Sequence, residues 1–457
     1  MKFISLLAGT ALVLSACAEA PSESKTPAPK PAVQVQNPDW SKDAVIYQIN
    51  TRQYSEAGTF DAVRKDLPRI KELGVDILWL MPIHPIGEAK RKGPMGSPYA
   101  VKDFQAVNPE LGTLEDFKTL VQTAQDMGMK VIIDWVANHT AWDNHLITEH
   151  PDWYTRNDAG EMQHPPDTDW LDVADLDYSK AGLRDYMTES LLYWVRDVGI
   201  DGYRCDVAGM VPTDFWNAVR PKLDAIKPVF MLAEWEEPEL HEQAFDATYA
   251  WKWKEAFQDL VNDKADATDI AAYYKTYQSD WPVEAMRMTY TSNHDQNTWD
   301  GTPFEIYGDA YEAAIALSFT GQGLPLIYNG QEGANDKRLK FFEKDEINWN
   351  LNSPLNQLFK DFAQFKTDNP VLWNGSWGTP MTEIRNDNSQ AVFSFIRETG
   401  DNTVLGIFNL SDAEQSVSFT DELPQGRYTQ FPNERFVEIA TYTRMTLGPW
   451  EYRLYSR

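Results

Sequence analysis

The chain alternates between apolar strand segments and amphipathic helical segments from residue 44 to residue 328. The stretch at 60–73, which follows the first strand candidate, has the 3.6-residue spacing of an α-helix. Thr113 and Asp116 form a capping-box pattern that opens another helix. The strand candidates lie at residues 44–49, 74–80, 129–136, 200–206, 229–234, 244–249, 287–291 and 323–328.

Strict alternation predicts parallel strands joined by right-handed crossovers, and eight repeats favour a closed (β/α)8 TIM barrel over an open sheet. The predicted fold class is therefore α/β, with the barrel at residues 39–374. Residues 138–178 contain no clear barrel helix and predict a short inserted domain after the third strand. Short alternating strands at 375–457 predict a C-terminal all-β domain, a β-sandwich.

The N-terminus has the pattern of an exported bacterial lipoprotein. A short basic start and an apolar run too short to span a bilayer precede Leu14-Ser15-Ala16-Cys17, which resembles a lipoprotein box. We expect residues 1–16 to be a signal peptide and Cys17 to be acylated, with 17–38, which hold five prolines, as an extended tether. Ala18 favours anchoring in the outer membrane, on its periplasmic or surface face. The alternative is an ordinary signal peptide in which Cys17 is incidental.

The composition excludes some classes of binding partner and favours others. The net charge of -28 argues against nucleic acid and against an anionic membrane surface, because both need basic patches, so membrane contact is expected only through the anchor. Aromatic residues make up 13% of the chain, more than a core alone needs, and their faces stack on sugar rings. Cys17 and Cys205 are the only cysteines, so an acylated Cys17 leaves no disulfide. We expect Cys205 to be a buried structural thiol.

Acidic and histidine side chains gather at the predicted strand ends, where the active sites of TIM barrels lie. They are Asp134, His139, Asp206, Glu234, His294 and Asp295. One carboxylate could be a cap or a buried salt bridge, but four together raise repulsion and desolvation costs that a fold avoids without a functional reason. Metal-assisted hydrolysis and glycoside hydrolysis both use such groups. No strand end carries His-x-His and aromatic residues are abundant, so the sequence favours glycoside hydrolysis.

Four segments, in order, carry a family resemblance. Asp134-x-x-x-Asn138-His139, Gly202-Tyr203-Arg204-Cys205-Asp206, Glu234 and Asn293-His294-Asp295 resemble the signature segments of the α-amylase family of glycoside hydrolases. Ala174-Asp175-Leu176-Asp177 is similar to a fifth segment of that family. The resemblance covers residues from about 40 to 457.

The resemblance implies a catalytic triad. Asp206 matches the nucleophile that forms a covalent glycosyl-enzyme, Glu234 the general acid and base, and Asp295 the carboxylate that holds sugar hydroxyls. Two inversions give retention, with the Asp206 and Glu234 carboxyls about 5–5.5 Å apart. Arg204, two residues before Asp206, should pair with it and keep it ionised.

The resemblance also implies substrate contacts. His139 and His294 match histidines that hydrogen-bond the sugar being cleaved, and Tyr99 matches the tyrosine that stacks on it. Candidate platforms for neighbouring sugars, with packing as the equal alternative, are Trp142, Trp170 and Trp235.

Two departures bear on metal binding. Gly209 and Met210 stand where members of the family often carry Lys-His, whose histidine carbonyl often helps to hold calcium. Asn138 matches a calcium ligand but lacks these partners, so it could equally orient the inserted loop. We therefore predict no metal site and no required cofactor, with a structural calcium as the alternative.

We expect an endo-acting, retaining hydrolase of α-1,4-glucosidic bonds that works as a monomer on starch, glycogen or maltodextrins. The short insertion favours an open cleft. A 4-α-glucanotransferase with the same triad is the alternative. A non-catalytic glucan-binding lipoprotein is disfavoured, because such proteins typically lose part of the triad and this chain keeps Asp206, Glu234 and Asp295.

Overall fold

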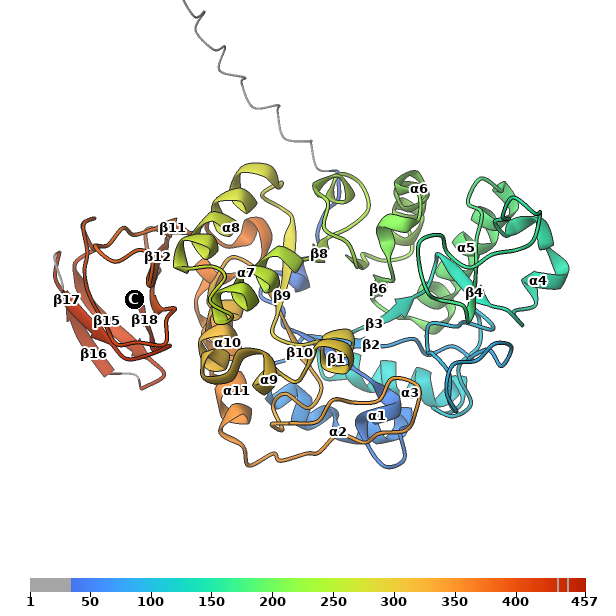
Figure 1. The fold of residues 1–457 in the computed structure, drawn as a ribbon, viewed down its shortest axis with the longest axis horizontal. Coiled ribbons are helices and arrows are strands. Elements are labelled where there is room, and N and C mark those ends of the chain that lie inside the picture. Colours follow the sequence, from blue (N-terminus) through green and yellow to red (C-terminus); the bar gives the residue numbers. More distant parts are fainter. Residues whose placement is uncertain (1–33, 434, 442–443) are drawn as a thin grey trace, which may run out of the picture. The chain divides into compact units, whose positions relative to one another are not determined.

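The computed structural model describes residues 34–433, 435–441 and 444–457 (Figure 1). The predicted signal peptide, Cys17 and most of the predicted tether lie outside these residues. In the part of the chain that the structure describes, no helix is long and apolar enough to cross a membrane.

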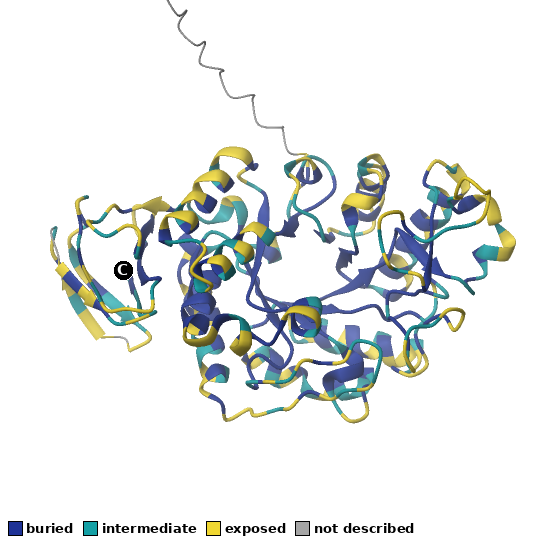
Figure 2. Cartoon of the chain, in the orientation of Figure 1, coloured by how far each residue is buried: buried dark blue, intermediate teal, exposed yellow. Residues whose placement is uncertain are grey.

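Eight parallel strands close into a barrel in the order β1-β10-β9-β8-β7-β6-β3-β2, which confirms the predicted TIM barrel. Each strand overlaps its predicted segment, and the barrel strands are buried along their length (Figure 2). Cys205 is fully buried among the apolar side chains that pack between strands and helices, as predicted. The strand bounds are β1 Ile46–Ile49, β2 Ile77–Leu80, β3 Lys130–Trp135, β6 Gly202–Cys205, β7 Phe230–Ala233, β8 Ala247–Tyr249, β9 Met286–Tyr290 and β10 Leu324–Tyr328.

The helices surround the barrel and bury their apolar faces on it. The predicted capping box is present, because the Thr113 side chain accepts from the Asp116 amide and the Asp116 side chain accepts from the Thr113 amide. The helix bounds are α1 Thr51–Tyr54, α2 Phe60–Glu72, α3 Leu114–Asp126, α4 Leu146–Glu149, α5 Ala181–Tyr193, α6 Thr213–Asp224, α7 Trp251–Val261, α8 Ala267–Asp280, α9 Pro303–Tyr307, α10 Tyr311–Thr320 and α11 Pro354–Asp368.

The insertion between β3 and α5 is built around a short antiparallel pair. Strand β4 (His139–Ala141) pairs with β5 (Val173–Asp175), with His139 opposite Asp175. Because β4 starts within a few residues of the end of β3, the insertion stands directly over the C-terminal end of the barrel.

After α11 the chain forms antiparallel sheets only. A six-stranded sheet has the order β11-β12-β13-β18-β15-β16, and β14 pairs with β17. This is the predicted all-β C-terminal region. Its strands are β11 Thr382–Glu383, β12 Val392–Glu398, β13 Thr403–Asn409, β14 Gln415–Ser418, β15 Gly426–Phe431, β16 Arg435–Ile439, β17 Arg444–Leu447 and β18 Tyr452–Ser456.

Residues 34–38, which the sequence assigned to the tether, lie against the barrel. The Gln34 amide donates to the Glu242 carbonyl at 2.7 Å, and the Asn37 side chain donates to the Glu284 carbonyl at 2.8 Å. Trp40 follows and packs on Phe230, the first residue of β7, with ring centroids 6.0 Å apart. This segment therefore crosses the N-terminal face of the barrel, because burial of its few apolar side chains outweighs its polar, proline-rich composition.

Candidate active site

Arg204 is the hub of the site. It lies in β6 and is fully buried. Its Nη1 donates to Asp134 Oδ1 at 2.8 Å and to Asp206 Oδ1 at 3.0 Å. Its Nη2 lies 2.7 Å from Glu234 Oε1. One guanidinium thus pairs with carboxylates from three neighbouring strand ends, which offsets part of the cost of burying them.

The turn after β6 sets the orientation of Glu234. Val207 has φ of 36°, in the left-handed region that a β-branched residue rarely adopts. Its backbone amide donates to Glu234 Oε2 at 2.7 Å. Such strain persists only where the surroundings over-determine it, and it is typical of functional sites.

A hydrogen-bonded chain fixes the ring of His294. Gln48 Nε2 donates to Nδ1 of His294 at 2.8 Å, so Nε2 carries the hydrogen in the neutral ring. That Nε2 lies 2.7 Å from the Tyr99 hydroxyl and 3.3 Å from Asp295 Oδ2. The Tyr99 hydroxyl in turn donates to Asp134 Oδ2 at 3.1 Å. Tyr99, His294 and Asp295 therefore form one connected group.

Both histidines of the site are neutral. Burial lowers the pKa of His139 and of His294 to about 3. His139 Nε2 lies 4.0 Å from Asp206 Oδ2, and its ring centroid lies 5.6 Å from that of Trp170. Neutral imidazoles at these places can exchange hydrogen bonds with hydroxyl groups without adding charge.

The charge balance at Asp206 differs from the sequence expectation. The predicted pairing with Arg204 is present and lowers the pKa of Asp206, but burial and the negative charge of Glu234 outweigh it and raise that pKa well above its usual value. Burial likewise raises the pKa of Asp134 to about 6. Burial, which outweighs the pairing with Arg204, therefore raises the pKa of both carboxyls in the free site.

These side chains form the floor of a cavity of about 470 Å³. Tyr99, His139, His294 and the predicted triad line this cavity, while Arg204 lies beneath it. Trp170, a candidate platform, lies in its wall. The lining residues are Lys92, Ser97, Tyr99, His139, Asp169, Trp170, Asp172, Val173, Asp206, Val207, Glu234, His294, Asp295, Trp299, Phe341 and Phe342.

Two predicted platforms are not among the lining residues. Trp142 donates to the Leu171 carbonyl at 3.0 Å and carries the Lys90 ammonium 3.3 Å from its ring centroid. Trp235 packs against Trp251, with ring centroids 6.0 Å apart.

The lining residues that sequence reasoning missed include four large side chains: Lys92, Trp299, Phe341 and Phe342. Trp299 follows Asp295 at the i, i+4 spacing of a helix, which is a usable signal. Lys92, Phe341 and Phe342 carry no comparable signal, because only the folded loops bring them to the cavity.

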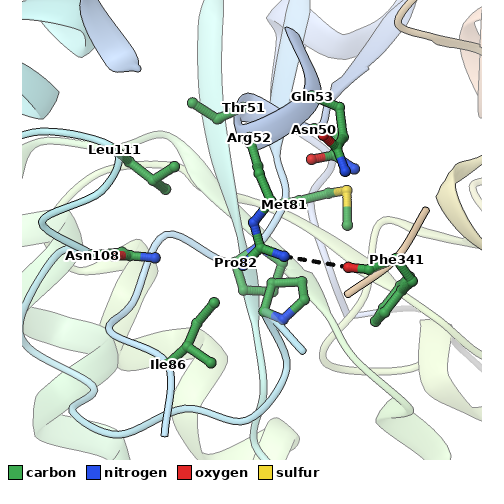
Figure 3. A pocket seen from close by; sticks show the side chains of 11 residues that line it. Asn50, Thr51, Arg52, Gln53, Met81, Pro82, Ile86, Asn108, Leu111 and Phe341 are labelled. Atoms are coloured by element: carbon green, nitrogen blue, oxygen red, sulfur yellow. Dashed lines mark hydrogen bonds between the residues drawn. The ribbon is translucent and has the colours of Figure 1, made fainter. Parts of the chain in front are cut away.

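A second, smaller pocket shows how one of these loops is held (Figure 3). Its volume is about 20 Å³, room for no more than a water molecule. Arg52 Nη1 donates to the Phe341 carbonyl at 3.3 Å (Figure 3). It also donates to the Gly96 carbonyl at 3.1 Å. The buried Arg52 thus ties the loop after β10 to the loop after β2.

The residues at the expected calcium position do not fit calcium. Asn138 Nδ2 donates to Asp175 Oδ1 at 3.3 Å, and Thr155 Oγ1 donates to Asp175 Oδ2 at 2.8 Å. Calcium needs six to eight oxygen ligands, whereas here an amide nitrogen and a hydroxyl already occupy the carboxylate. Within the described residues no group of three or more His, Cys, Asp or Glu side chains is placed to hold a metal. The Asn138 side chain connects the start of the insertion to β5 through this hydrogen bond.

Comparison with known proteins gives matches over nearly all of the described chain. The model of the α-amylase catalytic domain matches residues 43–378, and the model of the maltogenic amylase C-terminal domain matches 381–454. The solved maltogenic α-amylase AmyB of Thermotoga neapolitana is 31% identical with a TM-score of 0.83, covering 91% of this chain and 99% of that one. The solved α-amylase of Lactobacillus plantarum is 31% identical with a TM-score of 0.81, covering 92% of this chain and 99% of that one.

Curated relatives are longer. The α-amylase MalA of Haloarcula japonica is 28% identical over 413 residues, which are 85% of this chain and 58% of the relative. The α-1,4-glucan:maltose-1-phosphate maltosyltransferase of Rhodospirillum rubrum is 28% identical over 427 residues, 83% of this chain and 59% of the relative. The chain therefore spans less than two thirds of the length of these relatives.

Proposed function

This chain belongs to the α-amylase family of glycoside hydrolases, and we propose that it hydrolyses α-1,4-glucosidic bonds of starch, glycogen or maltodextrins with retention of configuration. Asp206 attacks the anomeric carbon of the donor sugar and forms a covalent bond, while Glu234 gives its proton to the leaving oxygen. Water then attacks the same carbon, Glu234 accepts its proton, and the Asp206 carboxylate leaves.

The bridging of Asp206 and Glu234 by Arg204 carries the proposal. The two carboxyls contact Nη1 and Nη2, which are bonded to one carbon of the guanidinium, so they lie side by side. Such closeness is typical of retaining glycosidases, whereas inverting enzymes leave room for a water between the carboxyls. Asp295 and the neutral His139 and His294 line the same cavity, which supports a role for them in holding hydroxyl groups of the donor sugar.

Maltoheptaose tests the proposal. The wild type should release α-anomers, observed by NMR before mutarotation, and Asp206→Asn should reduce the rate at least ~10³-fold, the scale on which loss of a catalytic residue acts. Asp309→Asn, at an exposed position, serves as the control. Absence of cleavage by the wild type, or release of β-anomers, would overturn the proposal.

The roles of Glu234 and Asp206 can be distinguished with substrates that differ in their leaving group. Glu234→Gln should lose activity on maltoheptaose yet still form the glycosyl-enzyme from an aryl maltoside, whose leaving group needs no proton. Equal loss on both substrates would contradict the role of Glu234 as the acid.

A 4-α-glucanotransferase remains the second candidate, because it would use the same triad. One relative is named as a maltosyltransferase. At high maltoheptaose concentration a transferase would give products longer than the substrate, whereas a hydrolase would give only shorter ones.

We also propose export as a lipoprotein anchored through Cys17, on the strength of the lipoprotein-box pattern. Labelling of cells with a palmitate analogue should mark the wild type and not Cys17→Ser. Equal labelling of both would contradict the anchor.

A further inference from the structure

The loops around the cavity join into a continuous rim on one side. The lining residues that rise above the floor come from the loops after β9, β10, β2 and β3, which, with β1, are consecutive around the barrel. The remaining strands, β6, β7 and β8, supply Asp206, Val207 and Glu234 but no wall. We call Trp170, Asp172, Lys92, Phe342 and Trp299 the donor-side rim.

Lys92 closes the first joint of this rim. Its Nζ lies 3.2 Å from Asp172 Oδ1 and donates to the Asp169 carbonyl at 3.1 Å. Asp172 is only 6% exposed at its side chain, so the ion pair is sheltered from solvent on that side. The loop after β2 is thereby attached to the insertion that follows β3.

The second joint connects the loop after β2 with the loop after β10. The Met95 amide donates to the Phe342 carbonyl at 3.0 Å. At Gly93 (φ of +63°) a Cβ atom would lie 2.5 Å from the Phe342 Cβ, so the two loops touch with no space between them. Arg52 supports this joint from below.

The third joint connects the loop after β10 with the loop after β9. The Leu339 amide donates to Asn297 Oδ1 at 2.9 Å, and the Thr298 hydroxyl donates to the Leu339 carbonyl at 2.9 Å. Trp299 and Phe342 stand next to each other on top, with ring centroids 6.1 Å apart. The rim thus runs unbroken from the insertion to Trp299.

Under the mechanism proposed above, the rim lies on the donor side of the scissile bond. Glu234 protonates the leaving oxygen, so the leaving saccharide extends over the open side, next to Val207. With the roles that the resemblance implies, the donor sugar would rest on Tyr99, His294 and Asp295, which line the cavity beside the rim. In an α-1,4-glucan the donor side leads toward the non-reducing end, and a chain that continued in that direction would run into the rim.

We propose that the donor-side rim turns the cleft into a pocket for the non-reducing ends of α-1,4-glucans, latched by the Lys92–Asp172 pair, so that the enzyme releases short saccharides of one dominant length. The inference rests on the hydrolytic function proposed above. It replaces the internal attack that the short insertion led us to expect.

Blocked and free maltoheptaose test the inference. The blocked substrate carries a benzylidene group on its non-reducing glucose and offers no free end. We expect the wild type to cleave the free substrate at least ~10-fold faster than the blocked one, a difference of about 1.4 kcal/mol in the transition-state free energy. Equal rates would overturn the inference and leave the hydrolytic function standing. No cleavage of either substrate would overturn both.

The latch is tested with Lys92→Ala and, because the loop could remain closed without the ion pair, with Phe342→Ala. Both variants should raise the blocked-to-free rate ratio severalfold and broaden the product lengths. Arg91→Ala is the matched control, since Arg91 has the same charge in the same loop, donates to the Gly87 and Ile86 carbonyls of that loop and does not line the cavity. Unchanged ratios in both variants would overturn the role of the rim.

Discussion

At the scale of single residues, the site buries more negative charge than is favourable for the stability of the fold. Asp134, Asp206 and Glu234 share one compensating cation, Arg204, in a buried space. The fold keeps this arrangement although paired burial of charges seldom adds net stability. The carboxylates are therefore expected to trade stability for chemistry.

Asp206→Asn should be more stable than the wild type at neutral pH. The raised pKa of Asp206 means that its ionised form costs stability in the folded state at pH values above that pKa. Removing the charge should add roughly 0.5–2 kcal/mol to the free energy of unfolding at pH 7. The gain should shrink as the pH falls through the raised pKa, because the wild type then takes up a proton. Urea unfolding at pH 7 and pH 4 measures both; a less stable variant at pH 7 would contradict the argument.

Gly209 lies so close to the Trp235 ring that a larger residue does not fit at this position. A Cβ atom there would lie 2.1 Å from the nearest ring atom of Trp235, so Gly209→Ala should displace this ring. Because Trp235 directly follows Glu234, the proposed acid, we expect the ratio of transfer to hydrolysis to change severalfold while cleavage persists. Product analysis at high maltoheptaose concentration measures it, with Gly400→Ala, where the added atom meets open space, as control. An unchanged ratio would remove Trp235 from the acceptor side.

At the scale of elements, the insertion is held by side chains. The Asn138–Asp175–Thr155 hydrogen bonds attach β4 and β5 to the end of β3. Since these bonds use no metal, the thermal midpoint and the activity should not change when a chelator is added.

Thr155→Val tests the same clamp directly. It should lower the free energy of unfolding by about 1 kcal/mol, the typical net value of one hydrogen bond. Thr119→Val, at an exposed position on α3, is the control. A chelator that lowered the midpoint of the wild type by several degrees would contradict the clamp.

The elements and the floor of the site were predictable from the sequence, and the walls were not. Strand periodicity located the barrel strands, and the rule that TIM-barrel sites lie at strand ends located Asp206, Glu234 and Asp295. Phe341 reaches the cavity only because Arg52, far away in the sequence, holds its loop. Loop positions depend on such distant contacts, so local pattern cannot supply them. For the same reason, the sequence makes Trp235 a candidate sugar platform but does not show that its ring packs against Trp251.

At the scale of the molecule, a buried arginine joins the C-terminal sheet to the barrel. Arg397 in β12 donates from Nη1 to the Gly321 carbonyl at 2.8 Å and from Nε to the Thr379 carbonyl at 2.9 Å. It is 1% exposed, and burial lowers its pKa to about 10. A charged donor spread over several backbone carbonyls makes the junction specific in geometry.

Arg397→Met should weaken that junction. Loss of the charged hydrogen bonds should lower the free energy of unfolding by about 2–4 kcal/mol, given about 1.5–3 kcal/mol for each bond to a charged group. Early proteolysis between the barrel and β11 should accompany it. Arg385→Met, which removes a surface pair with Asp421, should change little. Equal effects of both substitutions would show that the junction does not depend on Arg397.

Residues 34–41 run over the N-terminal face of the barrel. The triad opens at the opposite, C-terminal ends of the strands. Gln34, the first residue that the structure describes, therefore lies on the side of the barrel opposite the triad. In an enzyme anchored through Cys17, as proposed above, the catalytic pocket would open on the side of the barrel opposite Gln34.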